Sequence, residues 1–178
     1  MDLVIDTDFA SCFLCINKFN IVIDLYAPNI IFVEQVEEEL KKCKKYYSKI
    51  KQYISDNKIK CHEFYPWSRE CIEYCNLINH NHRIGKGEAS AMAYCRYIGG
   101  ILGSNNFSDI EKYCKIHKIN IKSSTDTMIE SFQKANFTEE EGNVMWTKML
   151  NKGRFLPFNS FSKALKKHIS FYDKYLKK

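Results

Sequence analysis

The chain has 178 residues, of which 45% are hydrophobic, and this is enough to bury one core in a single domain over residues 1–178. Its net charge of +6 is compatible with binding to nucleic acid, but is also common in lysine-rich proteins of other kinds. No apolar run is long enough for a membrane span and no secretory signal precedes the first one, so we expect no membrane association, a cytoplasmic setting and eight reduced cysteines.

Short apolar runs alternate with longer amphipathic segments along the chain. Strands are expected at residues 3–5, 30–33, 58–64, 100–103 and 120–122. Helices are expected at residues 9–25, 34–54, 67–77, 86–97, 107–117, 125–134, 138–151 and 160–175. The first strand, Leu3-Val4-Ile5, is entirely apolar, which is typical of a parallel strand buried on both faces. The alternation predicts an α/β fold with a parallel sheet between helices and a site outside the carboxyl ends of the strands.

Four acidic residues follow hydrophobic runs, at the end of a predicted strand or near the start of a helix. They are Asp6 in LVIDTD, Glu39 in VEQVEEEL, Glu88 in IGKGEASAMA and Asp109 in ILGSNNFSDI. A parallel sheet can gather such residues at one edge. Carboxylates that converge without paired cations usually hold a divalent metal, because its charge offsets their mutual repulsion. The four acids therefore indicate a metal site, although Asp6 by itself is equally well read as a loop aspartate.

The second acid is chosen from three consecutive glutamates by its position around the helix. The apolar stripe of this segment consists of Val36, Leu40, Cys43, Tyr47, Ile50 and Ile54. At about 100° per residue, Glu39 borders the stripe, whereas Glu38 points to water. Glu37 and Glu38 have lysine partners four residues later, as on an ordinary solvated face, but Glu39 is followed at that spacing by a cysteine. Glu39 therefore needs another role.

The other two acids have competing structural interpretations. Glu88 lies in line with the apolar residues Ala91, Met92 and Cys95, so it should border the core, where either a metal or the helix amino terminus can satisfy it. Asp109 stands three residues after Asn106, and the two can form a capping box at the start of their helix.

Taken in order, these segments resemble the PIN-domain ribonuclease family over roughly residues 2–134. LVIDTD is similar to the first-strand signature, IIFVEQVEEEL to the segment that carries the second acid, and GKGEASAMAYC to a Gly-Glu-Ala helix start. ILGSNNFSDIEKYCKIHKINIKSS resembles the late strand, acidic turn, helix, short strand and Ser/Thr turn. The resemblance implies a three-layer α/β/α domain with a parallel sheet of about five strands. Residues 138–178 lie beyond it, as a C-terminal helical extension.

The resemblance also implies an acidic pocket that binds Mg²⁺ or Mn²⁺. The catalytic acids carried over are Asp6, Glu39, Glu88 and a fourth from the Ser104–Asp109 turn, with Asp6, Glu88, Asp109 and Asn106 as metal ligands. The fourth acid departs from the family, because many members have an aspartate where this chain reads Asn105-Asn106. Three outcomes stay open: Asp109 replaces the missing acid, the site works with three carboxylates, or activity is lost.

The function implied by the resemblance is metal-dependent hydrolysis of RNA phosphodiester bonds by an endoribonuclease. Small stand-alone members of the family are often toxins of toxin–antitoxin pairs, so RNA, an inhibitory antitoxin protein and a second copy of the chain are the partners considered. The alternative is a catalytically silent PIN-like module that binds RNA or acts as an adaptor, and the Asn105-Asn106 departure supports it.

Four residues are assigned to the substrate. Lys86 and Ser104 flank the predicted site and can contact a phosphate, while Lys41 and Lys45 lie on a lysine-rich helix that also carries Tyr46 and Tyr47. Basic residues interleaved with aromatic ones suit a phosphate backbone and stacked bases. An ordinary solvated helix face explains these lysines equally well.

A third interpretation rests on the cysteines. Cys12 and Cys15, or Cys71 and Cys75 with His80 and His82, could indicate zinc or redox chemistry. The first pair lies on a hydrophobic helix and the spacings do not repeat, which favours buried thiols.

Overall fold

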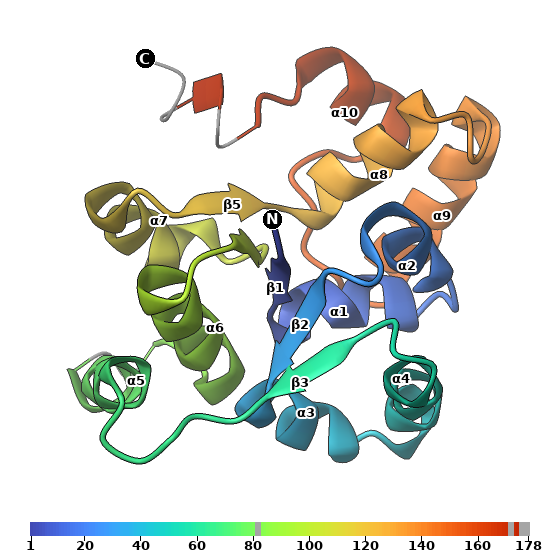
Figure 1. Ribbon diagram of the computed structural model, residues 1–178. Helices are drawn as coiled ribbons and strands as arrows, with labels where there is room; N and C mark the ends of the chain where they lie inside the picture. Colours follow the sequence, from blue (N-terminus) through green and yellow to red (C-terminus); the bar gives the residue numbers. More distant parts are fainter. Residues whose placement is uncertain (81–82, 171–172, 175–178) are drawn as a thin grey trace.

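The computed structural model describes residues 1–80, 83–170 and 173–174. Its centre is a five-stranded sheet in the order β3-β2-β1-β4-β5, with every neighbouring pair parallel (Figure 1). The strands are β1 (Leu3–Ile5), β2 (Ile30–Val33), β3 (Lys60–His62), β4 (Ile101–Gly103) and β5 (Asn120–Lys122). In register, Leu3 of β1 pairs with Ile30 on one side and Ile101 on the other.

Both faces of the sheet are buried, because successive side chains of a strand point to opposite faces. Leu3 and Ile5 contribute to one hydrophobic core, and Val4, which lies between them, contributes to a second. The same alternation continues in β2, where Ile30 and Phe32 join the first core and Ile31 and Val33 join the second. The apolar runs of the sequence are therefore strands buried on both sides, as predicted.

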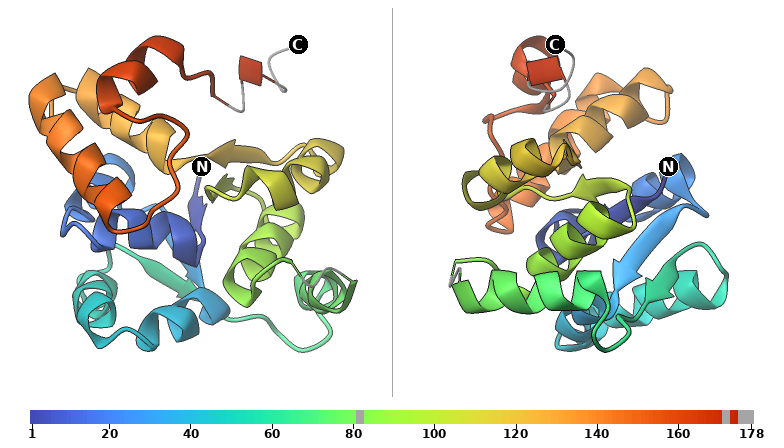
Figure 2. Two further views of the ribbon diagram at one scale, coloured as in Figure 1. Left: turned by 180° about the vertical axis from the view of Figure 1, so that it is seen from behind. Right: turned by 60° about the vertical axis from the view of Figure 1, so that its left-hand side comes forward.

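Helices cover the two faces and make the three-layer α/β/α fold predicted from the sequence (Figures 1 and 2). One face carries α5 (Arg69–His80), α6 (Lys86–Tyr97) and α7 (Phe107–His117). The other face and its flank carry α1 (Thr7–Leu14), α2 (Asn20–Tyr26), α3 (Glu34–Lys41), α4 (Lys44–Ser55), α8 (Ser124–Gln133), α9 (Glu139–Asn151) and α10 (Phe161–Lys167). None of the described helices is long and apolar enough to cross a membrane.

Three of the predicted helices are wrong in extent. The segment 9–25 is split into α1 and α2, with Asn17 in the left-handed region at φ 60°, and the segment 34–54 is split into α3 and α4 at Cys43, whose backbone is extended. The last helix, α10, ends at Lys167, and the backbone of His168 is extended, so the helix does not continue to residue 175; residues 171–172 and 175 lie outside the described part of the chain. Side-chain periodicity continues across such short breaks, so it does not reveal them.

The helices after residue 138 complete the main core. Trp146 of α9 and Phe161 of α10 are fully buried in the same cluster as Leu3 and Ile5 of β1. The amphipathic pattern predicted these helices but not where they pack.

Candidate active site

The carboxyl ends of the strands meet at one edge, and the strand order reverses its direction of growth between β1 and β4. In open parallel sheets, ligands bind in the crevice at such a switch point. A cavity of about 590 Å³ opens there. Its lining comes from the end of β1, α1, α3, the start of α4, the start of α6, the turn after β4 and the α9–α10 loop: Asp6, Thr7, Asp8, Ser11, Glu39, Leu40, Cys43, Tyr46, Arg83, Gly85, Glu88, Asn105, Asn106, Arg154 and Phe155.

Asp6 lies at the centre of the switch point, directly after β1, and only 2% of it is exposed. It is the N-cap of α1, and its Oδ1 accepts a hydrogen bond from the backbone N–H of Phe9 at 2.7 Å. Burial raises the pKa of Asp6 to about 8, and the charge of Glu88 adds to the rise, while hydrogen bonds from Ser104 and Phe9 oppose it. A cation in the cavity would favour the ionised form.

Glu88 approaches from the first turn of α6 and is 8% exposed. Its carboxylate accepts a hydrogen bond from the Asn106 side-chain amide at 3.2 Å and lies 3.5 Å from the Ser104 hydroxyl. Burial raises its pKa to about 7; the negative charge of Asp109 also raises it, and the Asn106 and Ser104 hydrogen bonds oppose the rise. A backbone hydrogen bond with Gly85, the N-cap residue, also satisfies this carboxylate, so part of the helix-start interpretation holds as well.

Glu39 reaches the cavity from α3 and is held on two sides. Its Oε1 accepts from the backbone N–H of Gly87 at 3.1 Å, and its Oε2 accepts from the hydroxyl of Thr7. A β-carbon on Gly87 would lie 2.7 Å from both Glu39 Oε2 and Thr7 Oγ1, so only glycine permits this approach of α6 to α3. The predicted phasing is confirmed: Glu38 is exposed, whereas Glu39 is partly buried, and Glu37 pairs with Lys41 at 3.1 Å.

The turn after β4 links the acids through amide groups. The side-chain amide of Asn106 donates to Glu88 and, at 2.9 Å, to Oδ2 of Asp109. Asn106 is the N-cap residue of α7, but its side chain makes no capping hydrogen bond, so the capping box proposed for Asn106 and Asp109 is wrong. Asp109 stands behind Asn106 and is not part of the cavity lining, so its service as a metal ligand stays a prediction.

Asn105 has a structural role at the other end of the same turn. Its side-chain oxygen accepts from the backbone N–H of Ser124 at 2.9 Å, and its side-chain nitrogen donates to the thiol of Cys12 at 3.3 Å. These two contacts connect the turn to α8 and α1.

The cations at the cavity are arginines. Arg154, in the loop between α9 and α10, donates from Nη1 to the Ser11 hydroxyl at 2.6 Å and lies 3.4 Å from Asp8 Oδ1. Arg83 lines the cavity near Gly85. The predicted substrate lysines Lys41, Lys45 and Lys86 are exposed and are not among the lining residues.

The sequence therefore identified part of this site. Asp6, Glu39, Glu88 and Asn106 come together at one cavity, as expected from the strand ends. Ser104 is buried beside Asp6 and Glu88, and its contact with a substrate stays a prediction. Arg154, Thr7 and Asp8 were missed. Thr7 and Asp8 directly follow Asp6, and Arg154 is one of four arginines in a lysine-rich chain, which is a weak signal.

The thiols do not form a metal centre within the described residues. Cys12, Cys95 and Cys114 are buried, as predicted, but Cys61 and Cys75 are exposed. No group of three or more His, Cys, Asp or Glu side chains in residues 1–80, 83–170 and 173–174 is arranged to hold a metal, and His82 lies outside those ranges.

The donors at the cavity nevertheless fit a hard divalent cation. Mg²⁺ keeps several of its waters and is commonly bound by one or two carboxylates, so it does not need a cage made only of protein groups. Asp6 and Glu88 provide two such carboxylates, both buried and with raised pKa values. Binding would exchange their protons for the metal.

In comparisons with known proteins, no family model matches the chain and no curated protein matches it.

Proposed function

We propose that the chain is a metal-dependent endoribonuclease that hydrolyses phosphodiester bonds of RNA, as its resemblance to PIN-domain ribonucleases implies. The observation that carries the proposal is the pair of buried carboxylates, Asp6 and Glu88, which face one open cavity at the switch point of a parallel sheet. Burial of two acids is costly even where hydrogen bonds offset part of the cost, and acids kept in such a state are typical of functional sites.

Each side chain has a definite part in the proposed reaction. Asp6 and Glu88 would hold Mg²⁺ or Mn²⁺, with Asn106 fixing Glu88 from behind. The bound cation would polarise a phosphodiester oxygen and lower the pKa of an attacking water.

Glu39 and the arginines act around these two acids. Glu39, clamped by Thr7 and Gly87, would accept the proton of the attacking water. Arg154 and Arg83 would bind the phosphate, and Asp8 and Ser11 keep Arg154 in position.

RNA would approach over the basic surface around this edge, where Lys41, Lys45 and Lys86 provide longer-range attraction. As in the toxins that the chain resembles, regulation would come from a small antitoxin protein that covers the cavity.

The test is cleavage of a mixed RNA pool with Mg²⁺, with Mn²⁺ or with EDTA. We expect cleavage with either metal, none in EDTA, and none for Asp6→Asn. The matched control is Asp56→Asn, an exposed aspartate in the turn after α4. If Asp6→Asn cleaves as well as the control, the proposal is wrong.

One observation favours a second candidate, the catalytically silent RNA-binding or adaptor module. The Asn106 amide bridges Glu88 and Asp109, so hydrogen bonds already satisfy part of the acidic charge without a metal. A silent module would bind RNA equally well in EDTA and in Mg²⁺ and would leave it intact in both.

A further inference from the structure

A second cavity, of about 400 Å³, adjoins the first. The two cavities share Asn105, Asn106 and Phe155 in their linings, so they form one continuous depression. The second lies between the start of α7, the start of α8 and the C-terminal segment. Its volume is within the range of about 300–1,000 Å³ that is usual for small-ligand pockets.

Phe155 stands between the cavities with 85% of its surface exposed. It follows Arg154 in the loop between α9 and α10, which passes close to α1 (Figure 2). These two adjacent residues place a guanidinium in the acidic cavity and an aromatic ring beside the second one. Phe107, Pro157 and Ile169 add further apolar surface to the second cavity. A single exposed phenylalanine is unremarkable by itself, but one that borders two cavities provides a stacking surface for a planar ligand.

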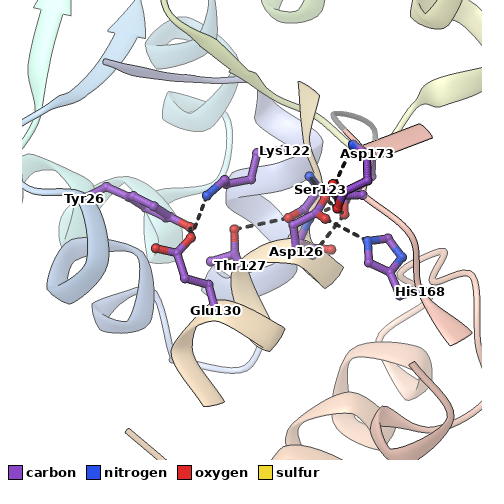
Figure 3. A network of polar contacts seen from close by, with 11 residues as sticks. Tyr26, Lys122, Ser123, Asp126, Thr127, Glu130, His168 and Asp173 are labelled. Carbon is purple, nitrogen blue, oxygen red and sulfur yellow. Dashed lines mark hydrogen bonds and ion pairs between the residues drawn. The ribbon is translucent and has the colours of Figure 1, made fainter. Parts of the chain in front are cut away.

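Polar groups line the rest of this cavity, and hydrogen bonds hold them in place. Figure 3 shows His168 joined to Asp126, with Nε2 and Oδ1 2.8 Å apart. Asp126 also accepts from the backbone N–H and the hydroxyl of Ser123, at 2.7 and 2.5 Å. Ser123 and His168 both line the cavity, as does Ser108. A wall fixed in this way loses little side-chain entropy when it binds a ligand.

We propose that the second cavity binds one base of single-stranded RNA, next to the phosphate held in the acidic cavity. This proposal rests on the proposed function and adds a substrate subsite to it. An unpaired base offers an aromatic face to stack on Phe155 and a polar edge for Ser108, Ser123 and His168. Acids and an arginine line one cavity, polar groups line the other, and Phe155 borders both, which suits a nucleotide, in which a charged phosphate is linked to a flat base.

The subsite also implies a preference for unpaired RNA. In a duplex the base faces are stacked and their pairing edges are occupied, so neither Phe155 nor the polar wall could reach them. Double-stranded RNA of the same sequence should therefore compete poorly.

Binding is measured in EDTA, where cleavage is excluded, with a short fluorescein-labelled single-stranded RNA. Nucleoside 5′-monophosphates and ribose 5-phosphate serve as competitors, because they differ only in the base. We expect nucleotides to compete better than ribose 5-phosphate, and Phe155→Ala to weaken RNA binding by roughly five- to 150-fold, the range for loss of one stacked base.

The control variants separate stacking from general effects. Phe155→Tyr keeps the ring and should bind as the wild type does. Trp67→Ala removes an aromatic residue that is 88% exposed and lines neither cavity, and should have no effect. Unchanged binding by Phe155→Ala, or equal competition by ribose 5-phosphate and nucleotides, would overturn the subsite.

The two proposals fail in different ways. If wild-type protein cleaves RNA while Phe155→Ala binds normally, the subsite is wrong and the nuclease stands. If wild-type protein never cleaves but loses binding on Phe155→Ala, the base subsite stands and hydrolysis is wrong. If wild-type protein binds no RNA in EDTA, the subsite is overturned whatever the cleavage assay shows.

Discussion

Two pairs of acids lie toward the same edge of the sheet, one pair buried and the other partly buried, and their surroundings differ. Asp6 directly follows β1, and Glu88 lies in the first turn of α6. Burial raises their pKa values, and the negative charges of neighbouring acids add to the rise. Asp126 and Glu130, on the helix after β5, are also desolvated, but hydrogen bonds and charge from His168 and Lys122 lower their pKa values (Figure 3). The surroundings therefore favour ionisation of the second pair and disfavour ionisation of the first.

Burial alone does not explain this contrast, because all four acids are desolvated. Asp126 caps α8 in a complete capping box with Ser123 and ties the C-terminal segment to it through His168. Glu130 is bound by Lys122 at 2.6 Å and by the Tyr26 hydroxyl at 2.7 Å. These partners account for both carboxylates, so replacing either acid should lower the stability of the fold.

Substitutions of Asp6 and of Asp126 should have opposite effects on metal binding and on stability. Asp6→Asn should abolish cleavage and remove the rise in Tm caused by Mn²⁺, with little loss of stability in EDTA, because asparagine also caps a helix and carries no charge. Asp126→Ala should leave the Mn²⁺ shift intact and lower stability by about 1–3 kcal/mol, the usual cost of losing hydrogen bonds to a charged group. Thermal melts with and without Mn²⁺ measure both. If Asp6→Asn unfolds the protein, Asp6 is structural.

The two groups should also differ in their response to pH in the absence of metal. The folded pKa values of Asp6 and Glu88, about 8 and 7, exceed their ordinary values of 3.8 and 4.5. Their contribution to stability is therefore complete below about pH 4 and is lost as the pH rises toward 8, with a slope of up to about 1.4 kcal/mol per pH unit for each retained proton. Asp126 and Glu130 act in the opposite direction: their stabilisation is present above their ordinary pKa values and is lost on acidification.

Urea unfolding in EDTA, at several pH values between roughly 5 and 8, measures this slope. Asp6→Asn should flatten it, while Asp56→Asn should not. A wild-type slope of zero would show that the two acids ionise as freely as in the unfolded chain.

A smaller effect concerns the clamp on Glu39. Glu39→Gln should lower cleavage by about an order of magnitude or more, because it removes the proposed base, whereas Glu38→Gln should be nearly neutral. Gly87→Ala should also lower cleavage, since the added methyl group displaces Glu39 and Thr7. Initial cleavage rates of the three variants test this, and equal rates for the two glutamine variants would remove Glu39 from the site.

The smallest effect is expected behind the cavity, in the asparagine turn. Asp109→Asn should lower cleavage only a few-fold, because Asp109 contacts Asn106 and not the cavity. Asn106→Asp would place a third carboxylate beside Glu88 and Asp109, so it should lower Tm in EDTA and enlarge the Mn²⁺-induced rise. Melting curves and Mn²⁺ titrations are sufficient to test both. Complete loss of cleavage in Asp109→Asn would instead identify Asp109 as the missing fourth ligand.

Local patterns in the sequence predicted the parallel sheet, the position of Asp6 at the end of β1 and the difference in exposure between Glu38 and Glu39. Each depends on a period of two or 3.6 residues, or on the residue that ends an apolar run, and neighbouring residues are enough to establish these. The breaks at Asn17 and Cys43 were not visible, because the apolar period continues through them.

The surroundings of the acids depend on contacts between segments that are far apart in the sequence. Arg154 and Phe155 reach the site from a loop that is more than a hundred residues from Asp8 and Ser11, and the Asn106 amide, not a capping interaction, connects Glu88 to Asp109. In the sequence, Asp6 and Asp126 both stand near the start of a helix after a short strand, Asp6 as the N-cap of α1 and Asp126 as the third residue of α8. They differ in their distant neighbours: the ring of His168 contacts Asp126, whereas the charge of Glu88 acts on Asp6. Contacts between distant segments leave no local periodicity, so the sequence does not reveal them.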